Sequence, residues 1–255
     1  MPIPFLRQLA GTRRTRRRDR HLGCVLAFVA GAVNAGGFLA IGQYTSHMSG
    51  IVSGMADDLA LGEVTLALAA LAAWMAFVLG AATTALLVNW GRRKQLHSRF
   101  ALILLLEAAL LLLFGLAGVN LAAMRDLLAP VTVLLLCFIM GLQNAIITKV
   151  SGAVIRTTHI TGMCTDMGIE LGKLFYYNRR PLASQPVHAN RDKLALHATL
   201  IAFFFCGGLC GALGFKHIGY SATVFLSFLL ALLTLGPIWQ DLRLRWRFYR
   251  RYGVL

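Results

Sequence analysis

Residues 157–172 read TTHITGMCTDMGIELG, and residues 46–60 read SHMSGIVSGMADDLA. Aligned without a gap from Ser46 and Thr158, they share His47 with His159, Gly50 with Gly162, Met55 with Met167 and Leu59 with Leu171. They also pair Ser46, Ser49, Ser53 and Asp58 with Thr158, Thr161, Thr165 and Glu170. Agreement at a fixed offset indicates an internal repeat. The sequence therefore predicts two copies of one unit, which resemble each other most in this polar part.

The composition indicates a membrane protein. Of 255 residues, 58% are hydrophobic, and the mean hydropathy of +0.68 is high for a soluble domain of this length. Six apolar segments each approach the ~20 residues that a spanning helix needs. They lie at 22–41, 64–90, 100–119, 127–147, 194–215 and 218–239. We therefore predict an all-α polytopic membrane protein with six transmembrane helices.

The net charge of +15 follows the expected topology. All Lys and Arg residues except Arg125 and Lys216 fall in the tail 1–21, the loop 91–99, the connection 148–193 and the tail 241–255. With six spans these four segments share one side of the membrane, as the positive-inside rule requires when both termini are cytoplasmic. Because topology accounts for the charge, we expect the lipid bilayer, and no nucleic acid, as a partner.

The repeat and the topology together predict inverted repeats. Upstream of the polar stretches, after a two-residue slip, Gly31, Asn34 and Ala35 match Gly141, Asn144 and Ala145. Each unit has three spans, an odd number, so the second copy enters the membrane from the opposite side. We divide the chain into a basic cytoplasmic tail (1–21), repeat 1 (22–120), repeat 2 (121–240, with a cytoplasmic connection at 173–193) and a second basic cytoplasmic tail (241–255).

Inverted repeats with polar interruptions in corresponding places are typical of secondary transporters, whose broken helices meet near the bilayer midplane. We expect each polar stretch to form a broken or half-helix that begins near its histidine, with Ser or Thr as N-cap. A free helix N-terminus favours an anionic ligand. The predicted ligand-binding residues are Asn34, Ser46, His47, Ser49, Gly50, Gln143, Asn144, Thr158, His159, Thr161 and Gly162.

Acidic side chains in the polar stretches and within one apolar segment are candidates for proton or ion coupling. One of them, Glu107, lies among leucines inside an apolar segment, where a carboxylate is costly and usually faces a partner or a cavity. The set is Asp57, Asp58, Glu107, Asp166 and Glu170. The five cysteines lack metal-type spacing. We predict neither a metal site nor a cofactor.

The elements GAVNAGGFLAIGQYTSHMSG and GLQNAIITKVSGAVIRTTHITG resemble the YoaK family of small bacterial membrane proteins. The likeness covers most of residues 22–239. The family is catalogued as a domain of unknown function. The resemblance implies about six membrane spans and a location in the bacterial inner membrane, and it brings no substrate or catalytic residue.

Three functions fit these patterns. The first is a transporter of a small polar or anionic solute or of an ion, with a site built from both polar stretches. The second is a membrane-embedded enzyme that uses a His and a carboxylate in acid–base work, although no catalytic signature is present. The third is a non-catalytic scaffold. Small-residue faces at 72–80 and 207–211 could serve the repeat interface or a homodimer.

Overall fold

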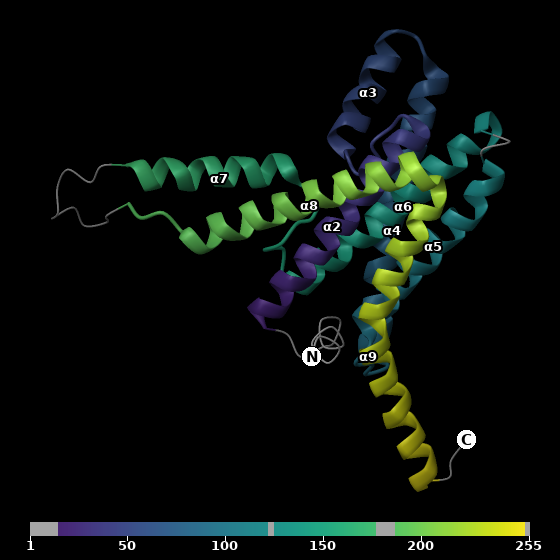
Figure 1. Cartoon of the computed structure of the whole chain (residues 1–255), viewed down its shortest axis with the longest axis vertical. Helices are drawn as coiled ribbons and strands as arrows, with labels where there is room; N and C mark the ends of the chain where they lie inside the picture. The colour runs from purple at the N-terminus through teal and green to yellow at the C-terminus, as the bar shows by residue number, and fades with distance from the viewer. Residues whose placement is uncertain (1–14, 122–124, 177–186, 253–255) are drawn as a thin grey trace.

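The computed structural model describes residues 15–121, 125–176 and 187–252 (Figure 1), and within these ranges it is entirely helical. In chain order the helices are α2 (Arg16–Ile41), α3 (Met48–Ala60), α4 (Val64–Arg93), α5 (Arg99–Leu121), α6 (Arg125–Ser151), α7 (Ile160–Phe175), α8 (Arg191–Ile218), the 3-10 turn η1 (Gly219–Ser221) and α9 (Ala222–Tyr252). Parts of the predicted tails, of the 173–193 connection and of the boundary near residue 121 lie outside the described residues.

Five described segments are long and apolar enough to cross a membrane: Arg16–Leu39, Val64–Arg93, Arg99–Leu116, Ala129–Ser151 and Arg191–Leu244. The last segment contains both α8 and α9, which meet at η1. The six apolar segments predicted from the sequence fall on α2, α4, α5, α6, α8 and α9. The fold is therefore all-helical and membrane-like, whereas the crossing of a membrane by six helices stays a prediction.

The most extensive helix contacts are those of α2 with α8, α4 with α6 and α5 with α9. Glycines allow the first contact, because a Cβ added at Gly31 would overlap the carbonyl oxygen of Phe204, and one at Gly207 would overlap that of Phe28. Small residues let helix backbones approach closely in this way.

The contact of α4 with α6 repeats this arrangement. A Cβ added at Gly141 would overlap the carbonyl oxygen of Phe77, and one at Gly80 would overlap that of Phe138. The two contacts can be matched residue by residue. Each residue of α6 corresponds to the residue of α2 with a number lower by 110, and each residue of α8 corresponds to the residue of α4 with a number lower by 127. Two different helix pairs thus pack through the same glycine and phenylalanine positions.

The short helices α3 and α7 lie outside these pairs. Helix α3 packs along α4, and α7 packs along α8. Figure 1 shows α3 and α7 running outward in different directions from the middle of the molecule. Each short helix begins one residue after its histidine, which confirms the prediction that the helices start there.

Outward-facing apolar side chains cover the long helices. On α4, Leu66, Leu68, Leu79 and Leu86 are all exposed. The buried cluster, by contrast, comes mostly from α2, α5 and α6. Exposed leucines along a whole helix are unusual in water and typical of a surface that faces lipid.

Candidate functional site

A tight bend follows α2. The helix ends at Gly42, which adopts a left-handed φ of 75°, and the chain then turns back along α2. The side-chain oxygen of Asn34 accepts two hydrogen bonds from Ser46, one from the backbone N–H (3.2 Å) and one from the hydroxyl (2.9 Å). The next residue, His47, precedes α3. Asn34 thus fixes the start of α3 beside the inner part of α2.

The same bend follows α6. Gly152 ends that helix with a φ of 62°, and the side-chain oxygen of Asn144 accepts a hydrogen bond of 2.7 Å from the hydroxyl of Thr158. His159 then precedes α7. Residues 31–39 and 141–149 also show the same order of buried, half-buried and exposed positions. The two polar stretches therefore share the asparagine–hydroxyl contact and the burial pattern of the helix before it.

One part of the prediction was wrong: Ser46 and Thr158 do not cap α3 and α7. The N-caps are His47 and His159, and neither makes a side-chain capping hydrogen bond. The two hydroxyls are instead used by Asn34 and Asn144. A hydroxyl before a helix can form a hydrogen bond with the first turn of that helix or with a side chain of another helix. The sequence does not distinguish these two arrangements.

Helices α2 and α6, which precede the two bends, contact each other. The Gln143 side chain of α6 donates to the carbonyl oxygen of Leu26 (2.6 Å), and a methyl group of Leu136 lies against Gly37. The two helices therefore run antiparallel here. Asn34 lies between Leu26 and Gly37 on α2, and Asn144 follows Gln143 on α6. Ser46 and Thr158 bind these asparagines, so one stretch is held on α2 toward the Gly37 end of the contact and the other on α6 toward the Leu26 end.

Three buried polar atoms, two in the bends and one on α6, have no hydrogen-bond partner within the described part of the chain. They are the hydroxyls of Thr45 and Thr157 and the side-chain oxygen of Gln143, all on residues with no exposed surface. Thr45 and Thr157 were not among the predicted ligand-binding residues. The repeated order Thr-Ser-His and Thr-Thr-His could have indicated them. A buried polar group without a partner costs about 1–3 kcal/mol.

The two histidines are exposed, and each ring packs against the glycine of the next helical turn, Gly50 or Gly162. The Nδ1 atom of His159 also lies 3.1 Å from an Arg156 guanidinium nitrogen. The hydroxyl residues Ser49 and Thr161 are exposed on the first turns of α3 and α7. This shared geometry explains the matching glycines.

Both acidic residues of α7 form ion pairs with lysines. Asp166 binds the Lys193 ammonium at 3.0 Å, and this hydrogen bond lowers the pKa of Asp166. Glu170 accepts from the backbone N–H of Asn190 (2.7 Å) and from Lys173 (3.0 Å). The Asn190 bond is the main cause of a lowered pKa at Glu170, and Lys173 adds to it. These contacts tie α7 to the start of α8.

Glu107 occupies a separate place, on α5, away from the bends. Its side chain is completely buried, and both carboxyl oxygens lack a hydrogen-bond partner among the described residues. On the next residue, the carbonyl oxygen of Ala108 accepts a hydrogen bond of 2.6 Å from Ser227 of α9. Glu107 therefore lies within α5, which packs against α9 and also contacts α6.

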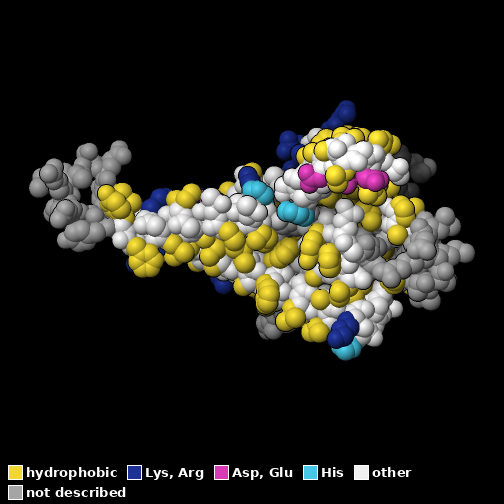
Figure 2. Space-filling view, turned by 90° about the horizontal axis from the view of Figure 1, so that it is seen from above, with side chains coloured by type: hydrophobic (Ala, Val, Ile, Leu, Met, Phe, Trp, Pro, Cys, Tyr) yellow, Lys and Arg dark blue, Asp and Glu magenta, His cyan; other side chains and the backbone are white. Residues whose placement is uncertain are grey.

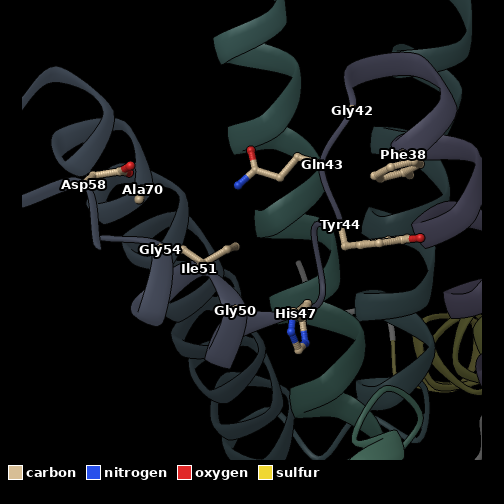
Figure 3. Close-up of a pocket in the computed structure, with 10 residues that line it drawn as sticks. All are labelled: Phe38, Gly42, Gln43, Tyr44, His47, Gly50, Ile51, Gly54, Asp58 and Ala70. Atoms are coloured by element: carbon tan, nitrogen blue, oxygen red, sulfur yellow. The ribbon is translucent and has the colours of Figure 1, made fainter. Parts of the chain in front are cut away.

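A cavity of about 310 Å³ runs beside α3 (Figure 3). His47 lies at one end and Asp58 at the other, while Gln43 points toward the side on which Asp58 and Ala70 lie. Asp57 is exposed and does not line the cavity. In the described ranges, no group of three or more His, Cys, Asp or Glu side chains is placed to hold a metal ion.

Comparison with known proteins gives one match. The family model described as "Protein of unknown function (DUF1275)" matches residues 22–236, which include all six apolar segments up to the last few residues. No curated protein and no solved structure matches the chain.

Proposed function

Because the chain belongs to the DUF1275 family, whose description names no activity, we propose a function from the geometry: the protein is a membrane transporter of a small polar solute or ion. One observation carries this proposal. Helices α2 and α6, which precede the two polar bends, contact each other, and Thr45, Thr157 and Gln143 keep buried polar atoms without partners in the described part of the chain. Polar solute or water bound between these segments would satisfy them.

The helix pairing supports an inverted repeat. The contact of α2 with α8 has a counterpart in α6 with α4, and that of α3 with α4 has one in α7 with α8. We count α8 and α9 as separate spans, which gives six spans with both termini on the cytoplasmic side of a bacterial inner membrane. In this topology α3 and α7 are half-helices whose N-termini lie beside α2 and α6, respectively. Discontinuous helices in corresponding places form the substrate site of many secondary transporters.

Glu107 is the candidate coupling group. A carboxyl that is buried without a partner is expensive, and intramembrane acids of this kind commonly belong to proton relays. Glu107 lies on α5, which packs against α9. A change in the packing of α5 against α9 would alter its surroundings.

An enzyme is the second candidate, because His47 and Asp58 line the same cavity. However, both belong to the α3 region and are separated by eleven residues. At 1.5 Å per residue this corresponds to ~16 Å along the helix. General acid–base partners must act within hydrogen-bond reach of one reacting group. The geometry therefore favours the transporter.

Alternating access provides a test that needs no known substrate. Single cysteines would replace His47 or His159 in a chain whose five native cysteines have been removed. Right-side-out and inside-out vesicles would then be treated with a membrane-impermeant maleimide. A transporter is expected to expose each cysteine to both sides in turn. As a control, a cysteine at the exposed Leu61, in the α3–α4 turn, should react from one side only.

Cross-linking tests the convergence of the two stretches. A short bis-maleimide should join Ser46→Cys to Thr158→Cys within one chain in native membranes. If this pair does not link, and if the two histidine positions react from one side each, then a scaffold replaces the transporter.

A further inference from the structure

The cavity beside α3 adjoins a second cavity of about 400 Å³. Gln43, Asp58 and Ala70 line both of them. The second cavity is otherwise walled by small or apolar side chains of α4 and α6. Among them are Ala69, Ala72, Pro130, Val133 and Leu134. The combined space therefore has one polar junction, at Asp58 and Gln43, and one apolar branch.

In the second repeat, side chains fill the corresponding place. The Lys193 ammonium lies 3.0 Å from one carboxyl oxygen of Asp166, and the ring nitrogen of buried His197 lies 3.9 Å from the other. These three residues pack α7 against the first two turns of α8. A cationic side chain and an imidazole thus occupy the space between the short helix and the long one.

The offsets between the repeats identify the first-repeat equivalents. The offset of 112 that aligns the histidines pairs Gly54 with Asp166. The offset of 127 that relates α4 to α8 also aligns their first residues, Val64 and Arg191. It pairs Leu66 with Lys193 and Ala70 with His197. Since Gly54 and Ala70 line the first cavity and Leu66 lines the second, the cavities lie where the second repeat has its own ion pair.

The acidic residues around α3 also have no basic residues near them in the sequence. Residues 42–63 contain Asp57, Asp58 and Glu63 and no Lys or Arg, whereas residues 152–175 contain two acids and two bases. Glu170 of the second repeat, which corresponds to Asp58, is paired with Lys173. The Asp58 carboxylate makes no hydrogen bond or ion pair with the rest of the described chain. In Figure 2, the acidic side chains in view gather over the α3 end of the molecule.

We propose that this pocket binds a primary alkylammonium ion. The ammonium group lies against Asp58 with the Gln43 amide oxygen as second acceptor, and the alkyl chain enters the branch lined by Ala69, Ala72 and Leu134. In the second repeat, the four-carbon side chain of Lys193 fills the corresponding space, and its ammonium binds Asp166, the equivalent of Gly54, one helical turn before the equivalent of Asp58. The N-terminus of α3 carries only about half a positive charge and lies three turns away, so the full charge of Asp58 dominates at the junction.

This inference goes beyond the proposed transport function, because Thr45, Thr157 and Gln143 do not line the pocket and binding needs no conformational cycle. The probe is n-butylammonium chloride, titrated calorimetrically into the purified full-length chain in detergent, at ionic strength held constant with NaCl. We expect saturable binding of n-butylammonium and none of n-butanol, its neutral counterpart. Absence of n-butylammonium binding, or equal binding of n-butanol, would overturn the proposal.

Two neighbouring acids provide a matched pair of variants. Asp58→Asn should weaken n-butylammonium binding by at least about tenfold, the effect of losing one hydrogen bond to a charged group. Asp57→Asn should leave binding unchanged, because Asp57 is exposed and lies outside the cavity. If both variants bind equally well, or lose binding equally, the site is not at Asp58.

A triple variant tests the comparison between the repeats. Gly54→Asp, Leu66→Lys and Ala70→His together transfer the second repeat's cluster into the first. A Cβ at Gly54 meets no atom within 4 Å, so the new carboxylate has room. Binding of n-butylammonium should be abolished while Tm stays equal or rises. Retained binding of n-butylammonium would contradict the proposal. If the triple variant does not fold, the effect of Asp58→Asn on n-butylammonium binding tests the proposal instead. Maleimide accessibility at positions 47 and 159 should be unchanged in the triple variant. Loss of n-butylammonium binding with unchanged accessibility would show that the pocket and the transport cycle are independent.

Discussion

The hydroxyl of Thr158 donates a hydrogen bond of 2.7 Å to the side-chain oxygen of Asn144, fourteen residues earlier in the chain. The Asn144 amide nitrogen in turn donates to the carbonyl oxygen of Met140 within α6 (2.8 Å). The asparagine is therefore held by its own helix and presents a fixed acceptor to the returning chain. Ser46 and Asn34 have the same relationship in the first repeat.

Removal of this hydroxyl should loosen the second bend. Thr158→Val keeps the shape of the side chain but leaves the Asn144 oxygen without its donor, at a cost of about 1 kcal/mol. Thr158→Ser keeps the hydroxyl and should retain most of the stability. Thermal unfolding in detergent, followed by tryptophan fluorescence, measures the difference. Equal Tm values for the two variants would show that the hydrogen bond does not stabilise the bend.

The buried threonines at the bends should respond in the opposite way. Thr45→Val and Thr157→Val each remove a buried hydroxyl that has no partner in the described structure, so Tm should rise by a few degrees, equivalent to about 1 kcal/mol. If these hydroxyls bind the transported solute, both variants should also lose alternating access at the two histidine positions.

A matched control is Thr84, which is equally buried but donates to the carbonyl oxygen of Leu142 (3.1 Å). Thr84→Val should lower Tm, because the carbonyl loses its donor. If Thr45→Val and Thr157→Val also lower Tm, their hydroxyls are satisfied by bound water, and the bends are already hydrated.

The sequence predicted the helical class and the starts of α3 and α7, because hydropathy and a repeated motif are local signals. It also placed Asn34, Ser46, Asn144 and Thr158 among the candidate ligand-binding residues, which stays a prediction. It could not predict that these residues bind one another, since a hydroxyl before a helix has more than one acceptor within reach. The contact of α2 with α6, the helices that precede the two bends, depends on residues more than 100 positions apart, such as Gln143 and Leu26.

The sequence also did not predict how the surroundings of α3 and α7 differ. The offset of 112 that aligns the polar stretches changes to 127 between α4 and α8, because α7 and the connection after it are both longer than α3 and the turn after it. The glycine contacts and the starts of α4 and α8 reveal that second offset. A comparison at 112 alone therefore cannot pair Ala70 with His197, and the cavity beside Asp58 has no signature in the sequence.

The glycines at the helix contacts should tolerate no side chain. Gly207→Ala places a methyl group on the carbonyl oxygen of Phe28, and Gly80→Ala does the same at Phe138. Each variant should lose about 1–3 kcal/mol, the usual effect of overpacking, with a fall in Tm measured in detergent. Gly168→Ala is the control: a Cβ there meets no atom within 4 Å, and alanine favours the helix by about 0.5–1 kcal/mol. Similar effects at Gly80 and Gly168 would contradict the close packing of α4 and α6.

Acid should release α7 from α8. The pKa of Asp166 is lowered by its hydrogen bond with Lys193, and that of Glu170 by the Asn190 N–H and Lys173. A carboxyl whose pKa is lower in the folded state stabilises it above the unfolded pKa, and this contribution is lost as the pH falls through the folded value. Tm should therefore fall between pH 7 and pH values below about 4. The double variant Asp166→Asn, Glu170→Gln should have a lower Tm at pH 7 and a smaller fall in acid, whereas Asp57→Asn should behave as the wild type. If the double variant keeps the full acid sensitivity, then other carboxyls control it and the α7–α8 ion pairs do not.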